Sequence, residues 1–181
     1  MILYDTKYLQ LKSAKSKTNS DWIYAHRPNI TDVVVILPII NNKETLFIIE
    51  DRPPIIAEYG AKKIIGLPAG LVGDIREGER TEDAIHTELL EETGLEAERI
   101  TILAKHVASS AGCTSETFTI ALAEITNCRT VKEPDDDGGV ITDRVRVKLS
   151  EIDNWLKQKE KEGYILTAQM LSALYYLKEV I

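Results

Sequence analysis

Three glutamates at helical spacing, Glu88, Glu91 and Glu92, are the residues in this sequence best suited to do chemistry. On a helix, positions i, i+3 and i+4 share one face, so the three carboxylates would lie side by side. Carboxylates that close repel one another, and a divalent cation would neutralise them. Mg²⁺ is the natural choice because it takes hard oxygen ligands and also binds substrate phosphates. Taken alone, however, this spacing more often marks a solvated acidic face on a surface helix.

The residues around these glutamates favour the metal interpretation. The segment from Gly73 to Leu95 resembles the Nudix box, G-x5-E-x7-R-E-U-x-E-E-x-G-U, in which U is apolar. Eight of the nine fixed positions match at the family's spacing, and the ninth, an arginine in the family, is Thr87 here. The matching residues are Gly73, Glu79, Glu88, Leu89, Glu91, Glu92, Gly94 and Leu95.

This resemblance implies a fold, a reaction and a cofactor. The fold would be an α/β/α sandwich, and the reaction hydrolysis of the diphosphate of a nucleoside diphosphate linked to another group. Glu88, Glu91 and Glu92 would be metal ligands, Glu91 and Glu92 would also be catalytic, and Glu79 would be a supporting acid. Mg²⁺ is the expected cofactor and Mn²⁺ a possible substitute, since such ions activate water and neutralise phosphate oxygens.

The loop before the box is longer than the family's usual one. Family members commonly place five residues between the glycine of a Pro-Ala-Gly sequence and the loop glutamate. Here eight residues separate Gly70 from Glu79, and five separate Gly73 from Glu79. We interpret this as a three-residue insertion, which leaves Gly70 and Gly73 as competing equivalents of the box glycine. By the same resemblance, the backbone carbonyl of Ala69 is a candidate metal ligand.

Further similarity to the ADP-ribose pyrophosphatase group extends over most of the chain. Leu67-Pro68-Ala69-Gly70 resembles that group's strand end, Arg52-Pro53-Pro54 resembles its R-P-P, and Ser109 to Glu116 resembles its S-x-G-x-[ST]-x-E loop. These similarities imply ADP-ribose as the leading substrate, cleaved to AMP and ribose 5-phosphate. The substrate-binding residues implied in these segments are Arg52, Ser110 and Gly112. Taken alone, the segment from Ser109 to Glu116 could equally be a Gly/Ser turn between strands, but at this distance after the box it is better interpreted as a substrate loop. Glu116 would then bind metal through water or act as the base.

The N-terminal segment aligns more loosely with the same group. Tyr8 and Trp22 match the places where related enzymes put aromatic residues that sandwich adenine, and Arg27 matches a substrate-binding arginine. Flat aromatic faces stack on a purine without demanding hydrogen bonds. The alternative is that Tyr8 and Trp22 only pack an edge strand. In the resembling enzymes these strands cross to a second subunit, which implies a homodimer.

The general base has several candidates in the sequence. Related enzymes place it on a loop before the final strand, which points to Asp143, and Asp135, Asp136 and Asp137 compete with it. A solvated acidic loop is the alternative. At the level of function, a pyrophosphatase for another nucleotide sugar such as GDP-mannose and a non-catalytic nucleotide sensor also stay open.

Two departures from the family pattern suggest a lost ion pair. The family arginine is Thr87 here, and the glutamate that the pyrophosphatase group often carries two residues before Pro68 is Gly66. Loss of both partners strands no buried charge, whereas loss of one would. We therefore hypothesise that the two losses compensate each other.

Composition restricts the other function classes. Of 181 residues, 44% are hydrophobic and 28% are charged, the balance of a soluble globular protein. The formal net charge of −7 argues against non-specific nucleic-acid binding. Two cysteines without a CxxC pattern are too few for a disulfide framework or a zinc site. We expect a cytoplasmic protein with no membrane partner, because no signal peptide is recognisable and the longest apolar run, Val33 to Ile40, is short.

Periodicity and turn residues predict an α+β fold, or an α/β/α sandwich with a mixed sheet. We expect N-terminal strands over residues 1–30 as a substrate and dimer extension, and a hydrolase domain over residues 31–181. A glycine-rich loop is expected from Leu67 to Glu79, and a polar turn from Ser13 to Asp21. Strands are expected at 2–11, 22–27, 33–37, 46–49, 100–108, 116–124 and 143–149, and helices after Thr81, from Ser150 to Gly163 and from Thr167 onward.

Overall fold

The computed structural model describes residues 1–60, 62–73, 78–126, 130–135 and 140–180, and the chain forms two separate sheets with four α-helices in this part. No helix in these ranges is both long and apolar enough to cross a membrane. In chain order the elements are β1 (Ile2–Asp5), β2 (Gln10–Lys15), β3 (Asp21–His26), β4 (Asp32–Ile40), β5 (Glu44–Glu50), α1 (Pro53–Tyr59), β6 (Ile64–Gly66), β7 (Ala69–Val72), α2 (Thr81–Thr93), β8 (Arg99–Ala108), β9 (Thr117–Ile125), β10 (Ile141–Lys148), a 3-10 turn (Leu149–Glu151), α3 (Ile152–Lys161), β11 (Ile165–Leu166) and α4 (Ala168–Val180).

The larger sheet has eight strands and mixed direction. Its main path runs β11-β6-β5-β4-β9-β8, with β10 paired to β5 and β7 paired to β4. The pairs β4–β9 and β11–β6 are parallel, and the others are antiparallel. Most residues of β4 and all but the first of β5 are buried, as their continuous apolar runs predict for strands covered on both faces.

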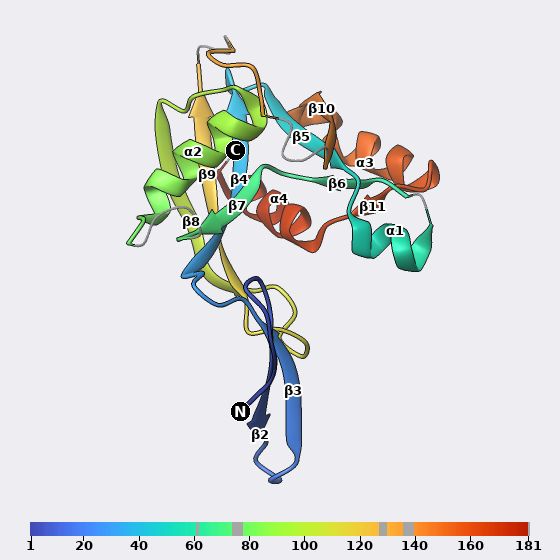
Figure 1. Ribbon diagram of the computed structural model, residues 1–181. Coiled ribbons are helices and arrows are strands. Elements are labelled where there is room, and N and C mark those ends of the chain that lie inside the picture. The colour runs from blue at the N-terminus through green and yellow to red at the C-terminus, as the bar shows by residue number, and fades with distance from the viewer. Residues whose placement is uncertain (61, 74–77, 127–129, 136–139, 181) are drawn as a thin grey trace.

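Helices cover both faces of this sheet, so the predicted α/β/α sandwich is confirmed (Figure 1). On one face, Ala84, Ile85 and Leu89 of α2 pack into a core with alternate residues of β4 and β9. On the other face, α3 and α4 pack against the opposite side chains of the same strands, through Leu156 and Met170 among others. We call the larger sheet and the helices that cover it the body. The body therefore has two hydrophobic layers, one on each side of the sheet.

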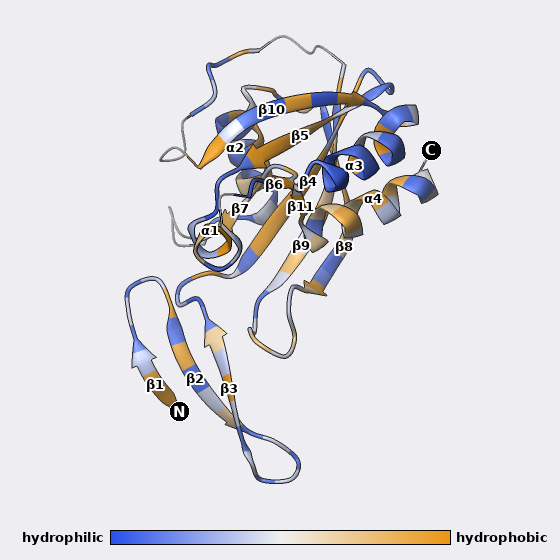
Figure 2. Cartoon of the chain, turned by 90° about the vertical axis from the view of Figure 1, so that its right-hand side faces the viewer, coloured by the Kyte–Doolittle hydropathy of each residue, from blue (hydrophilic) through white to orange (hydrophobic). Residues whose placement is uncertain are grey.

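The smaller sheet, β1–β2–β3, extends away from the body, and we call residues 1–26 the arm (Figure 1). In Figure 2, β2 alternates between hydrophilic and hydrophobic residues. The register pairs Tyr4 with Leu11 and Ser13 with Ile23, so Tyr4, Leu11 and Ile23 share one face of the arm. All three of these apolar side chains are exposed.

Several predicted boundaries and two predicted loops were wrong. Ala69 to Val72 is a strand rather than the start of a loop, because its backbone completes an antiparallel ladder with β4. Ser13 to Lys15 continue β2 instead of forming a turn, because they pair with Asp21 to Ile23 of β3. Strand 2–11 divides into β1 and β2, since residues 6–9 turn back through hydrogen bonds to the Thr6 hydroxyl.

The helix ends also differ in detail from the prediction. Pro53 and Pro54 follow the end of β5 and begin α1, a helix that the sequence did not predict, because proline is tolerated in the first turn of a helix. Thr81 is the first residue of α2, and the extended Arg80 precedes it as N-cap without a side-chain cap. Ser150 likewise caps nothing and lies within the 3-10 turn before α3. Gly94 closes α2, because it is left-handed, as glycine readily allows, and its N–H donates to the Leu90 carbonyl.

Candidate active site

Helix α2 presents its glutamates to the short strand β7. Ile85 and Leu89 point into the core and fix the rotation of the helix, as their spacing predicts. With that face anchored, Glu92 is 6% exposed and accepts a hydrogen bond from the Ala69 N–H, with 3.0 Å between N and Oε2. The strand and the helix are therefore joined directly at a carboxylate that the sequence predicts to be catalytic.

Gly70 provides the space that Glu88 occupies. A Cβ atom at position 70 would overlap the Glu88 carboxylate, so only glycine allows the side chain to lie over this backbone. Glu88 and Glu92 thus lie against neighbouring residues, Gly70 and Ala69, of a single strand. The sequence left Gly70 and Gly73 as competing equivalents of the box glycine, and in the structure Gly70 is the one that contacts a predicted metal ligand.

Gly73 has a different task at the end of β7. Its φ of +96° lies in the region that favours glycine, and its N–H donates to Oε2 of Glu79 at 3.0 Å. Glu79, which lies just before α2, therefore binds the backbone at the end of β7.

The C-terminal end of α2 is held by a segment far along the chain. The Glu91 carbonyl accepts the Asp135 N–H at 2.8 Å, and Arg144 of β10 donates to the carbonyls of both Glu92 and Asp135. The hydrogen bond from Lys132 to Asp135, together with the charges of Asp135 and Glu91, raises the pKa of the Lys132 amine. The segment that contains Lys132 and Asp135 therefore packs against α2 at Glu91 and brings the positive charge of Lys132 near its carboxylate.

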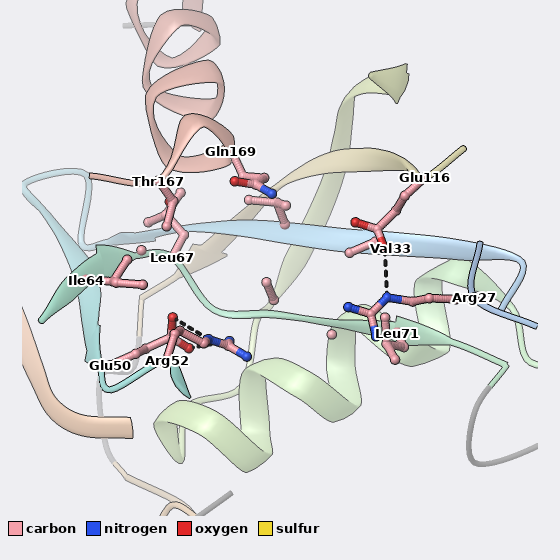
Figure 3. Close-up of a pocket in the computed structure, with 14 residues that line it drawn as sticks. Arg27, Val33, Glu50, Arg52, Ile64, Leu67, Leu71, Glu116, Thr167 and Gln169 are labelled. Atoms are coloured by element: carbon pink, nitrogen blue, oxygen red, sulfur yellow. Dashed lines mark hydrogen bonds and ion pairs between the residues drawn. The ribbon is translucent and has the colours of Figure 1, made fainter. Parts of the chain in front are cut away.

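A pocket of about 340 Å³ opens beside β7, with Ala69 and Gly70 in its wall. Two arginines enter it from opposite sides and extend toward each other (Figure 3). Arg27 pairs with Glu116 at 2.8 Å, and Arg52 pairs with Glu50 at 2.6 Å. The complete lining is Arg27, Val33, Val35, Glu50, Arg52, Ile64, Gly66, Leu67, Ala69, Gly70, Leu71, Glu116, Thr167 and Gln169. Two guanidinium groups facing one cavity suit a ligand with two anionic groups, such as a diphosphate.

Comparison with known proteins identifies the family. The model of the NUDIX domain matches residues 30–168, most of the chain. The chain belongs to the Nudix family. A solved structure described as an ADP compounds hydrolase is similar in fold, with a TM-score of 0.73 and 20% sequence identity over 99% of this chain and 89% of that one. No curated protein sequence matches the chain.

The Nudix fold brings some of the predicted site residues together. Ala69, Arg27, Arg52 and Glu116 line one pocket, and Glu88 and Glu92 lie against its β7 wall. Within the described ranges, no group of three or more His, Cys, Asp or Glu side chains is arranged closely enough to hold a metal ion. The carboxylates of Glu88, Glu91 and Glu92 therefore belong to one helix face but do not lie close enough together to coordinate a metal ion.

The predicted substrate loop joins the arm to the Nudix body. The Trp22 indole N–H donates to the Gly112 carbonyl at 3.0 Å, and Ala25 exchanges backbone hydrogen bonds with Cys113 and Ser115. Ser110 closes the turn by accepting two N–H groups at its carbonyl. Ser110, Gly112 and Trp22 thus lie at a junction beside the pocket and are absent from its lining.

Tyr8 and Trp22 do not form an aromatic pair within one chain. Trp22 pairs with Ala14, whereas Tyr8 lies in the turn before Gln10, which pairs with His26. Four residues of strand separate these two places, roughly 13 Å. Both aromatic side chains are exposed.

Asp143 is on the far side of the sheet from the glutamates of α2. Its charge reaches Lys159 of α3, whose pKa is raised chiefly by a hydrogen bond to Glu162. The next residue, Arg144, points to α2 instead, because neighbouring side chains of a strand alternate. Asp135 pairs with Lys132, and Asp136 and Asp137 lie outside the described residues. Glu116 is thus the predicted base candidate that lines the pocket.

Three polar residues of the pocket were missed in the sequence: Glu50, Thr167 and Gln169. Glu50 precedes Arg52 by two residues, a spacing that places both on one side of a strand end, and that signal was available. Thr167 and Gln169 come from the start of α4, about 100 residues further on than β6. No local pattern marks them, because only the packing of α4 brings them to the pocket.

Gly66 and Thr87 have different surroundings, which weakens the hypothesis that their departures form one lost pair. A Cβ atom at position 66 would have Thr167 and Glu50 as its nearest neighbours, inside the pocket. Thr87 instead lines a shallow hollow with His86 and Glu96, among others. The structure therefore associates Gly66 with Glu50 rather than with position 87.

Proposed function

We propose that this Nudix protein is a Mg²⁺-dependent diphosphatase that cleaves ADP-ribose to AMP and ribose 5-phosphate. The observation that carries the proposal is the pocket beside β7, where Arg27 and Arg52 face each other and Glu88 and Glu92 lie against the wall. Two cations for a diphosphate line the pocket, and carboxylates for a metal ion lie against the strand that forms its wall. The name of the similar solved structure, an ADP compounds hydrolase, agrees with an adenine nucleotide.

The residues at β7 suit a magnesium ion by their chemistry. Glu88, Glu91, Glu92 and the Ala69 carbonyl offer only oxygen ligands, as Mg²⁺ prefers, and Gly70 leaves room for the Glu88 carboxylate beside the strand. When bound, the ion would activate water and neutralise phosphate oxygens. Mn²⁺ is an acceptable substitute because it also takes hard oxygen ligands.

The chain's own side chains would bind the diphosphate and accept a proton. Arg27 and Arg52 would each bind phosphate oxygens from opposite sides of the pocket, which holds the diphosphate in place for attack. Hydrolysis joins a water oxygen to one phosphorus, breaks the bridging P–O bond and releases one proton. Glu116 would take that proton, because it lines the same pocket and its carboxylate is only partly exposed.

The arm would bind the adenine, and this requires a homodimer. Trp22 and Tyr8 are too far apart to stack on the same ring from one chain. A second copy would provide the other aromatic residue, so that the base lies between two subunits. The exposed apolar face of Tyr4, Leu11 and Ile23 supports such an interface, because a contiguous apolar patch marks a protein–protein contact.

A panel of nucleotide sugars tests this proposal. The purified protein is incubated with ADP-ribose, ADP-glucose, GDP-mannose and UDP-glucose, each with Mg²⁺, with Mn²⁺ and with EDTA, and products are resolved by chromatography. We expect the highest kcat/KM for ADP-ribose, AMP as a product and no turnover with EDTA. Preference for GDP-mannose would reject the adenine assignment, and binding without turnover would indicate a nucleotide sensor.

A further inference from the structure

A buried carboxylate lies at one end of the substrate pocket without a role in the proposed reaction. Glu50 is the last residue of β5 and is only 4% exposed. Its two oxygens accept both hydrogen bonds of a fork from Arg52, Nε to Oε2 at 3.1 Å and Nη2 to Oε1 at 2.6 Å. A buried charge needs such partners, and a bidentate pair also fixes the plane of the guanidinium group.

The guanidinium group of Arg52, oriented by this fork, lies in the wall of the pocket. About half of its side chain is accessible, at 46%, and the guanidinium group extends toward Arg27 across the cavity (Figure 3). A flexible arginine would sample many rotamers, and each lost rotamer reduces binding entropy when substrate arrives. Because Glu50 is buried and Arg52 is half accessible, the carboxylate is the fixed partner and the guanidinium group is the one that can meet a ligand.

The surroundings of Gly66 show that a side chain at position 66 could also bring a carboxylate to Arg52. Position 66 lies on β6, next to β5, and its backbone is outside the left-handed region. A Cβ atom there would lie 3.8 Å from Oε2 of Glu50 and 3.7 Å from the Thr167 side chain, both ordinary contacts. A glutamate side chain spans such a distance from its Cβ to its oxygens. A carboxylate from position 66 would therefore reach the place that the Glu50 carboxylate fills.

We propose that Glu50 is a positioning residue, which holds Arg52 in its substrate-binding orientation and replaces a carboxylate that position 66 could provide. The role in substrate binding rests on the proposed function, whereas the exchange of carboxylates between positions 50 and 66 does not. The pair acts on binding rather than on the chemical step, because Arg52 meets the substrate in the ground state and the transition state alike.

A double-mutant cycle tests the exchange. The variants are Glu50→Ala, Gly66→Glu and the two combined, with Gly66→Gln in the Glu50→Ala background as the uncharged control of equal size. We expect Glu50→Ala to lower the Tm and to raise KM for ADP-ribose by about tenfold with kcat within about twofold. Gly66→Glu alone should also be harmful, because two carboxylates would then crowd one guanidinium group.

The decisive result is that the effect of Gly66→Glu changes from harmful in the wild-type background to beneficial in the Glu50→Ala background. In the Glu50→Ala background, Gly66→Glu should recover most of the Tm and of the KM, and Gly66→Gln should recover less of either. Equal harm from Gly66→Glu in both backgrounds would overturn the exchange, and an unchanged KM in Glu50→Ala would overturn the positioning role. If Glu50→Ala does not fold, Glu50→Gln replaces it as background, since it keeps the volume and one acceptor oxygen.

One readout keeps this inference separate from the proposed function. The Arg52 Nε–H signal in a ¹⁵N NMR spectrum reports the hydrogen bond to Glu50 without any substrate. We expect it to shift in Glu50→Ala and to return toward its original position in the double variant. If no nucleotide sugar is turned over, the proposed function fails, and the Tm cycle and this signal still decide whether positions 50 and 66 exchange the carboxylate.

Discussion

The body and the arm of this Nudix protein hold their candidate functional residues in opposite ways. Glu92 is buried, its helix is anchored through Ile85 and Leu89, and its carboxylate bonds to a strand of the central sheet. Trp22 is 53% exposed and is tied to the body by one side-chain hydrogen bond to Gly112. The carboxylate of Glu92 is therefore held firmly by the packing of the body. The position of Trp22 depends instead on contacts between the arm and the loop that contains Gly112.

This contrast predicts different kinetic effects from the two regions. Residues of the body that act on the reacting groups should change kcat, since their interactions strengthen in the transition state. Residues of the arm that bind the base should change KM, because the base does not react.

The largest effect is expected in the body, from Glu92→Gln. The change removes the charge and keeps the volume and an acceptor for the Ala69 N–H, so the fold should persist. We expect kcat to fall by at least roughly a hundredfold, with the far-UV circular dichroism unchanged. Glu82→Gln is the matched control, because Glu82 lies on the exposed side of the same helix and should be neutral. Full turnover by Glu92→Gln would remove Glu92 from the catalytic set.

Breaking the proposed dimer interface on the arm should give the next largest effect. Leu11→Glu with Ile23→Glu places two charges on the exposed apolar face, and we expect light scattering after gel filtration to report a monomer. The KM for ADP-ribose should rise by about tenfold, because the second aromatic residue of the clamp is lost. Ala14→Glu, on the opposite face of β2, is the control and should stay dimeric. A wild-type protein that is already monomeric would contradict the homodimer.

A smaller effect within the arm is expected from Trp22→Ala. Loss of one stacking face should raise KM several-fold, by about 1 kcal/mol of binding, with kcat nearly unchanged. Lys17→Ala is the control, since Lys17 is exposed in the turn between β2 and β3 of the same arm. An equal fall in kcat and kcat/KM for Trp22→Ala would show that the arm takes part in the chemical step, and the division between the two regions would fail.

The smallest effect concerns pH at the junction of arm and loop. Burial first, and then the charge of Lys12, lowers the pKa of His26 below its ordinary 6.5, and its Nδ1 lies 2.9 Å from the Ser115 hydroxyl. The neutral form is the one that the docked arm favours. Docking is therefore most stable above pH 6.5 and weakens as the pH falls through the lowered pKa.

Hydrogen exchange measures this pH dependence at the backbone bonds between arm and loop. Protection factors of the Ala25 and Ser115 amides should fall between pH 7 and pH 5.5, while those of β4 in the body stay constant. His26→Asn keeps a neutral hydrogen-bonding group and should abolish the change. The same fall in protection in His26→Asn would assign the pH dependence to another group.

Local patterns in the sequence were sufficient to predict the helix that carries the candidate metal ligands and much of the fold. The spacing of Ile85 and Leu89 predicts the buried side of α2, because a helix repeats every 3.6 residues, and the same repeat puts Glu92, seven residues after Ile85, on that side, where it is buried. The apolar runs of β4 and β5 predicted strands buried on both faces, which is the observed state. These features depend on neighbours in the chain, so the chain alone determined them.

Tertiary structure decided the pocket and the surroundings of each candidate. Asp143 could be placed beside the final strand from the sequence, but the side of the sheet to which it points depends on the register of β10 against β5, which includes a bulge. Gly66 looked like the partner of Thr87 until the packing of β5, β6 and α4 placed Glu50 and Thr167 around it. These contacts join residues distant in sequence, and their geometry follows from how two layers pack on one sheet, which no local spacing contains.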